Sequence, residues 1–123
     1  MFKKIFGTII IIIIIIILFI LLNKKNDNEI VLITHGGVPY NWEYTIEDTS
    51  IVKFKEMMSV SKSIGTVGGE VEEHYIFEGL KEGKAKINFI YKNITDNSIE
   101  KTINYEVIVD KNMKITIYKI SET

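Results

Sequence analysis

The 123-residue sequence contains no cysteine, no arginine and a single proline, Pro39. Without cysteine no disulfide can hold the fold, and a lipid-modified cysteine after the N-terminal apolar segment is excluded. The lack of cysteine does not by itself identify the cellular compartment. After residue 25 the sequence also lacks sustained 3.6-residue apolar periodicity, which argues against helices in that part of the chain.

Basic charge is scarce once the N-terminal segment is set aside. All 15 basic residues are lysines and four of them precede residue 26, which leaves 11 lysines against 16 acidic residues. Residues 26–123 therefore carry a net charge of about −5, the difference between 11 and 16. Proteins that bind nucleic acid need a basic face, so we expect no nucleic-acid partner.

One long apolar run stands at the N-terminus. Residues 5–22 carry no charge, are rich in isoleucine and have two lysines on each side. As an α-helix this run would measure roughly 27 Å, about the thickness of the hydrocarbon core of a bilayer. Isoleucine favours strands in water, but a lone segment in lipid must satisfy its own backbone hydrogen bonds and therefore becomes a helix.

We predict that residues 1–25 form an uncleaved membrane anchor and residues 26–123 a separate domain. The apolar run is long for a signal peptide and lacks a small-residue cleavage site. The lysines are balanced, so only the N-terminal amine favours an inside N-terminus. We expect a protein of the cell membrane that crosses once, with its domain outside. A cleaved signal peptide and the opposite orientation are the alternatives.

Residues 26–123 have the pattern of an all-β domain. Apolar and polar residues alternate over short stretches separated by turn residues roughly every 8 to 15 positions, which is typical of an immunoglobulin-like β-sandwich. Such a fold gathers its loops at two ends, where recognition takes place. The predicted strands are residues 29–34, 42–47, 51–54, 70–78, 84–91, 99–109 and 113–120, with residues 55–69 irregular.

No pattern in the sequence supports catalysis or cofactor binding. His35, Gly36 and Gly37 resemble the element that supplies oxyanion-hole amides in lipases, but no G-x-S-x-G elbow accompanies it. His74 shares a strand face with Glu72, yet the two histidines lack the spacing of metal ligands and no cysteine assists them. We expect no enzyme, no metal and no cofactor, and we interpret both histidines as solvent-exposed.

The stretch THGGVPYNW, residues 34–42, combines a glycine pair with the only proline and two aromatic residues. The glycines allow backbone to enter a narrow cleft without Cβ atoms, and Pro39 reduces the ordering cost of binding. Tyr40 and Trp42 would fix the base of this loop, with Tyr40 open to either packing or partner contact. The alternative is that the glycines and the proline only shape a tight turn between two sheets.

The order of elements resembles the chagasin-like inhibitors of papain-type cysteine peptidases, inhibitor family I42. The motifs of that family are N-P-T-T-G followed by Y-x-W, then G-x-G-G, then R-P-W or R-P-F after a strand that ends in tyrosine. Here residues 40–42 match Y-x-W, Gly68 and Gly69 match the end of G-x-G-G, and residues 83–91 match the strand. The resemblance covers roughly residues 29–110. Its loop motifs have diverged: both threonines are missing, and Lys92 stands where the arginine would.

The resemblance implies an immunoglobulin-like sandwich that wedges three loops into the cleft of a papain-type cysteine peptidase and blocks its cysteine without being cleaved. The expected peptidase-binding residues are His35, Gly36, Gly37, Val38, Pro39, Tyr40, Thr66, Val67, Gly68, Gly69, Lys92, Asn93 and Ile94. We expect a monomeric domain with that peptidase as its protein partner. The alternative is a non-inhibitory surface module that binds another envelope protein through the same loops or a sheet edge.

Overall fold

The structure, a computed structural model, describes residues 2–22, 27–61 and 69–123. Within these ranges one helix precedes seven strands. They are α1 (Phe2–Leu22), β1 (Glu29–His35), β2 (Tyr40–Ile46), β3 (Val52–Ser61), β4 (Glu70–Gly79), β5 (Gly83–Asn93), β6 (Ile99–Val109) and β7 (Ile115–Glu122). The prediction of an all-β domain behind one N-terminal helix is confirmed.

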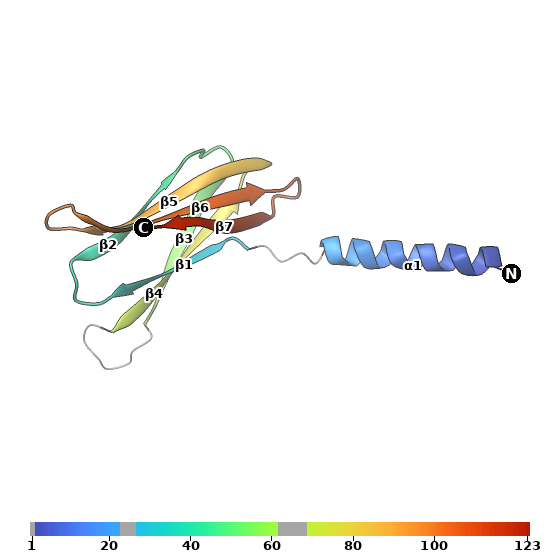
Figure 1. The fold of residues 1–123 in the computed structure, drawn as a ribbon, viewed down its shortest axis with the longest axis horizontal. Helices are drawn as coiled ribbons and strands as arrows, with labels where there is room; N and C mark the ends of the chain where they lie inside the picture. The colour runs from blue at the N-terminus through green and yellow to red at the C-terminus, as the bar shows by residue number, and fades with distance from the viewer. Residues whose placement is uncertain (1, 23–26, 62–68) are drawn as a thin grey trace.

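The strands form two sheets that pack as a sandwich (Figure 1). The smaller sheet has the order β1-β4-β3, and the larger sheet has the order β2-β5-β6-β7. Every strand pairing is antiparallel. The chain changes sheet after β1, after β2 and after β4, so the first crossing coincides with the glycine-rich stretch.

Apolar residues that alternate along the strands meet between the two sheets. The alternation predicted for β5 and β6 is seen directly, because Ile87, Phe89 and Val107 are fully buried. The buried core consists of Ile30, Leu32, Val52, Tyr75, Phe77, Ala85, Ile87, Phe89, Ile103, Val107, Val109 and Ile115. All of these residues lie between positions 30 and 115, so the core does not depend on α1.

The sandwich has two distinct ends. At the helix end, where the chain arrives from α1, the Asp27 amide donates to the Ile115 carbonyl at 3.1 Å, next to the turn of residues 110–114. At the loop end lie the β1–β2 loop, residues 36–39, and the β5–β6 loop, residues 94–98. Figure 1 shows these two loops at the side of the sandwich away from α1.

The structure corrects the prediction that residues 55–69 are irregular. Strand β3 continues to Ser61 and pairs with β4, with a bulge between Phe54 and Glu56. Beyond Phe54 its side chains are exposed on both faces, and β3 is an edge strand of the smaller sheet. An edge strand that covers little core needs no regular alternation, so the sequence gives no period-two signal. Strand β7 begins at Ile115, after a turn in which Met113 has φ 63°.

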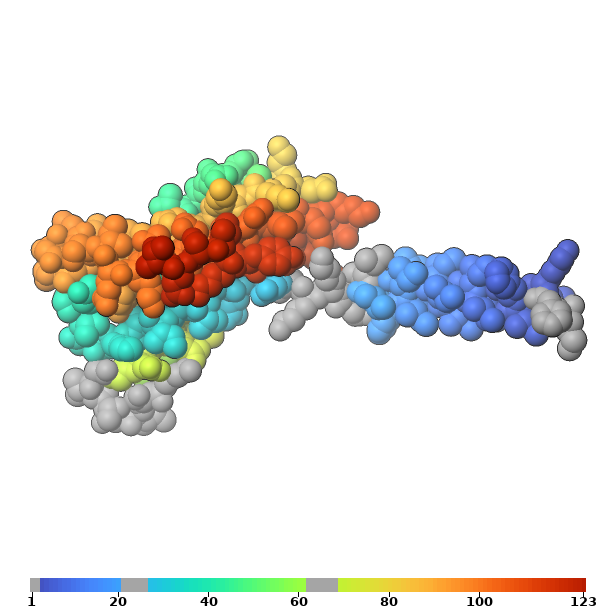
Figure 2. All heavy atoms as spheres, viewed as in Figure 1, coloured from blue at the N-terminus to red at the C-terminus, as the bar shows by residue number. Residues whose placement is uncertain are grey.

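Helix α1 contains the apolar run. Its residues Lys3–Ile20 have a mean hydropathy of 2.8, and none of this stretch is buried by the rest of the chain. In Figure 2 the helix projects from the sandwich with its surface uncovered in this view. A helix of this length and composition is a candidate membrane span, and a signal sequence has the same properties.

Candidate functional site

The β1–β2 loop lies between two other connections at the loop end. The Gly36 amide donates to the Gly69 carbonyl at 3.1 Å, and the Ile94 amide donates to the Pro39 carbonyl at 2.8 Å. These two bonds place the predicted first and third loops side by side and attach the last residue of the predicted second loop. The other residues predicted for that second loop, Thr66, Val67 and Gly68, lie outside the described residues.

The glycine pair and the proline act differently within the β1–β2 loop. Gly37 has φ +80°, a conformation that favours glycine, and a Cβ atom there would meet nothing within 4 Å. Pro39 lacks an amide hydrogen, and its carbonyl is the acceptor that holds Ile94. Val38, between them, has 44% of its surface exposed. The tip of this loop therefore presents open backbone at Gly37 and one apolar side chain.

Stacked aromatic rings form the base of the β1–β2 loop. Tyr40 stacks on Tyr91 with ring centroids 5.2 Å apart, and Trp42 lies 4.7 Å from Tyr91. The Trp42 indole donates to the Ile33 carbonyl at 3.1 Å, and the Tyr91 hydroxyl is 3.0 Å from that of Thr34. Both bonds cross from one sheet to the other. Tyr40 and Trp42 thus fix the loop base, as predicted, and Tyr40 packs.

Short-range hydrogen bonds shape the β5–β6 loop. The Asn93 side chain accepts from the Thr95 amide at 2.8 Å and from its hydroxyl at 2.6 Å. Asp96 accepts likewise from the hydroxyl and amide of Ser98, and these bonds lower the pKa of the Asp96 carboxyl. Asn97 has φ 63°. A loop with this many internal bonds loses little further entropy on binding.

The comparison with protein families shows the family to which this domain belongs. The family described as chagasin family peptidase inhibitor I42 matches residues 22–109. The chain belongs to this family. No curated protein and no solved structure gives a match to it. The chagasin-family match covers β1 to β6 and leaves β7 beyond it. Members of this family are peptidase inhibitors, so the domain is not an enzyme.

Lys92, Asn93 and Ile94 all differ from the R-P-W or R-P-F motif of the chagasin family. Lys92 stands in place of the motif's arginine, and its ammonium lies 3.7 Å from the carboxylate of Glu43 on β2. Ile94 stands in place of the aromatic residue and has 59% of its surface exposed. The positive charge is therefore partly neutralised within the chain, while the apolar character of the third loop is kept in a smaller side chain.

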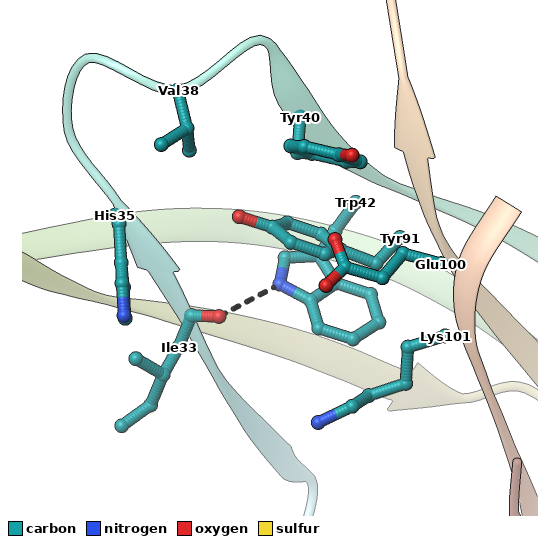
Figure 3. A pocket seen from close by; sticks show the side chains of 8 residues that line it. All are labelled: Ile33, His35, Val38, Tyr40, Trp42, Tyr91, Glu100 and Lys101. Atoms are coloured by element: carbon teal, nitrogen blue, oxygen red, sulfur yellow. Dashed lines mark hydrogen bonds between the residues drawn. The ribbon is translucent and has the colours of Figure 1, made fainter. Parts of the chain in front are cut away.

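A groove of about 400 Å³ opens beside the β1–β2 loop (Figure 3). Its walls come from both sheets and from the loop, and they consist of Ile33, His35, Val38, Tyr40, Trp42, Tyr91, Glu100 and Lys101. Lys101 is also paired with Glu122 of β7 at 3.3 Å. His35 is the exposed last residue of β1 and faces this groove (Figure 3). Glu100 and Lys101 were not predicted, because they follow the third loop and belong to no motif.

The structure corrects the prediction that His74 is a solvated residue. Its side chain is 21% exposed, its Nε2 lies 3.0 Å from a Glu72 carboxylate oxygen, and its Nδ1 contacts the Glu29 carboxylate. The hydrogen bond to Glu29 is the main reason that the pKa of His74 is raised, and Glu72 adds to it. Among the residues that the structure describes, no group of three or more histidine, aspartate or glutamate residues is arranged so that it could hold a metal ion. His74 therefore belongs to an ion-pair cluster of the smaller sheet.

Proposed function

We propose that this chagasin-family domain inhibits papain-type cysteine peptidases by placing adjacent loops in their active-site cleft. The observation that carries the proposal is the pair of backbone bonds that ties Gly36 to Gly69 and Pro39 to Ile94. Through these bonds three connections from different parts of the sequence share one end of the sandwich. A set of loops held in this way is suited to enter a cleft as one body.

The β1–β2 loop is the element proposed to cover the catalytic cysteine. Gly37 offers backbone without a side chain, so the chain can approach the bottom of a narrow cleft. Gly36 and Pro39 are held by hydrogen bonds to the neighbouring connections. A loop held at both ends resists the extended conformation that a substrate adopts, so it occupies the site without offering a peptide bond for attack.

The remaining predicted residues are proposed to contact the walls of the cleft. His35, Val38 and Tyr40 flank the first loop, while Lys92, Asn93 and Ile94 form the start of the third. Gly69 represents the second loop within the described chain, and Thr66, Val67 and Gly68 are proposed to complete it. Among the members of this set that the structure describes, Val38 and Ile94 are the most exposed aliphatic side chains, at 44% and 59%. They would contribute most of the apolar contact area.

We further propose that α1 anchors the domain in the cell membrane, with residues 5–22 spanning it, the N-terminus inside and the domain outside. The support is the length of the helix, its mean hydropathy of 2.8 and the lysines at both of its ends. The core of the sandwich contains no residue of α1. The domain is therefore expected to fold, as a monomer, when the anchor is removed.

The test is inhibition of papain by the soluble fragment of residues 26–123. We expect competitive inhibition that weakens at least about tenfold, roughly 1.4 kcal/mol, on Gly37→Trp, because the indole blocks close approach of the backbone. The matched control is Asn112→Trp, an exposed position in the β6–β7 turn at the helix end, which should leave inhibition unchanged.

A folded fragment that inhibits neither papain nor its relatives would contradict the proposal. It would favour the non-inhibitory surface module, for which the Lys92–Glu43 pair and the missing loop aromatic provide the structural argument. Thermal unfolding of each variant separates loss of inhibition from loss of the fold.

A further inference from the structure

The chain enters the sandwich at the end opposite the proposed inhibitory loops. The Asp27 amide donates to Ile115, and Asn28 bonds Phe77 twice, through its carbonyl at 2.9 Å and its side-chain amide at 3.1 Å. These bonds fix residues 27 and 28 to the helix end. From there β1 carries the chain along the sandwich to His35 at the loop end (Figure 1).

The connection between α1 and the sandwich is short compared with the sandwich itself. From Leu22, the last residue of α1, to Asp27 there are five residue steps, which span at most about 18 Å when fully extended. From Asp27 to His35 there are eight steps, which cover roughly 26 Å at the rise of a strand. If the domain were inverted, with its loops toward the membrane, the loop end would extend farther from Asp27 than the linker can lift Asp27 from the membrane. The loop end would then have to enter the bilayer. The loops therefore cannot face the membrane in which α1 is anchored.

The net negative charge of the domain also favours an orientation in which the loops point away from the membrane. Residues 26–123 carry 11 lysines and 16 acidic residues, whereas Lys24 and Lys25 follow the apolar run closely in the sequence. A membrane surface that contains anionic lipids attracts the two lysines and repels the acidic domain. This repulsion opposes a domain that lies flat on the membrane and favours one that stands upright, with the loop end farthest from the lipid.

We propose that the anchored domain presents its loops away from its own membrane and inhibits peptidases that reach it from solution. To bind these loops, a peptidase must lie farther from the membrane than they do, with its cleft turned toward the membrane. A peptidase on a short stalk in the same membrane cannot reach that position, so the domain does not inhibit it. The inference rests on the proposed function and its anchor. The partner that fits this surface is a soluble papain-type peptidase, and a neighbour held on a short stalk in the same membrane does not fit it.

The orientation of the domain relative to the membrane can be measured without any peptidase. Because the chain has no cysteine, Val38→Cys and Asn112→Cys each provide a single labelling site, at the loop end and the helix end respectively. Each full-length variant, reconstituted in vesicles of phosphatidylcholine and phosphatidylglycerol, carries a donor fluorophore, and the lipid headgroups carry the acceptor. We expect strong energy transfer from position 112 and much weaker transfer from position 38. Equal transfer from the two positions would overturn the proposal.

The consequence for inhibition is tested with papain in two forms. One form is free in solution, and the other is fused through a four-residue stalk to a single-span helix in the same vesicles as the full-length chain. We expect the stalked papain to be at least about tenfold less sensitive than the free enzyme. An insertion of about 30 glycine and serine residues after Lys25, which spans roughly 30 Å, should abolish the difference.

The outcomes separate the two proposals. Equal inhibition of free and stalked papain with the natural linker would overturn the inference while leaving the inhibitory function intact. Free papain that is not inhibited would instead contradict the proposed function, and the energy-transfer measurement would still decide the orientation of the domain.

Discussion

The two ends of the sandwich are stabilised in different ways. At the helix end Val52, Val109 and Ile115 are at most 1% exposed, and their side chains close the space between the sheets. At the loop end Tyr40 and Trp42 are only half-buried, and stacked rings and hydrogen bonds across the sheets replace a close-packed core. Burial of apolar surface contributes most at the helix end, while polar contacts and ring stacking position the loops.

This difference explains how the chain keeps the chagasin fold while its loop motifs change. A side chain that is already exposed loses little burial energy when it is replaced, so substitutions at the loop end cost little stability. A buried side chain at the helix end has no such freedom, because its neighbours relax only partly around a cavity. Buried residues thus carry the stability and the exposed loop end carries the proposed recognition, and paired variants of buried and exposed residues test this separation.

The largest effect is expected from Phe89→Ala. The Phe89 ring is fully buried and lies 4.9 Å from the ring of Tyr75, so its loss leaves a cavity between the sheets. We expect the free energy of unfolding to fall by about 3–5 kcal/mol, measured by chemical denaturation of the fragment of residues 26–123. Ile94→Ala at the exposed loop end should change stability by less than about 0.5 kcal/mol yet weaken papain inhibition. Similar stability losses for both variants would contradict the separation of roles.

A smaller effect is expected where glycine permits close packing. A Cβ atom on Gly79 would lie 2.8 Å from a methyl group of Val109 and 3.0 Å from the carbonyl oxygen of Met113. Gly79→Ala should therefore cost about 1–3 kcal/mol through overpacking. Gly37→Ala has open space and should cost only about 1 kcal/mol, from the strain of its positive φ. Thermal unfolding of the two variants provides the comparison, and a larger loss for Gly37→Ala would reverse the expected order.

The fold was predictable because it depends on burial, and burial leaves a period-two pattern in the sequence. Strands β5 and β6 show that pattern over most of their length. The second half of β3 was missed because an edge strand with exposed side chains has no such constraint. Similarly, the contact between His74 and Glu29 joins residues 45 positions apart and depends on the register of β1 against β4.

The sequence predicted where the β1–β2 loop and its base lie, but not the hydrogen bonds that join this loop to its neighbours. Glycine and proline mark the β1–β2 loop through their own conformational preferences, and the aromatic residues that follow mark its base. The bonds from Gly36 to Gly69 and from Ile94 to Pro39 involve main-chain atoms, which every residue possesses. No choice of side chain signals these bonds, so only the resemblance to the chagasin-like family predicted that the loops lie together.

At the base of the loops, Tyr91→Phe should have an effect of about 1 kcal/mol. The substitution keeps the ring that stacks between Tyr40 and Trp42 and removes the hydroxyl bond to Thr34, which links the two sheets. We expect lower stability by that amount together with weaker papain inhibition, because the loop base is held less firmly. Tyr118→Phe is the control, since that side chain is 54% exposed on β7. If both variants behave alike, the Tyr91 hydroxyl does not position the loops.

The smallest effect is expected from the cluster of Glu29, Glu72 and His74, which joins β1 and β4 of the smaller sheet. The Glu29 carboxylate, assisted by Glu72, raises the pKa of His74 above its usual 6.5, so the folded state favours the protonated form. The resulting stabilisation is fully present below the pKa of the unfolded state and is lost as pH rises through the raised pKa. The free energy of unfolding should therefore fall as the pH rises above 6.5 and through the raised pKa of His74, measured by denaturation at several pH values.

Two variants assign this pH dependence to the cluster. His74→Gln should abolish the decrease with rising pH, and Glu29→Gln should reduce it, because it removes the main cause of the raised pKa. Papain inhibition at constant pH should be unchanged in both, since neither Glu29 nor His74 is among the proposed peptidase-binding residues. A decrease that persists in His74→Gln would show that other groups titrate with folding. A change in inhibition would instead show that the smaller sheet transmits strain to the loops, and stability and recognition would then not be carried by separate residues.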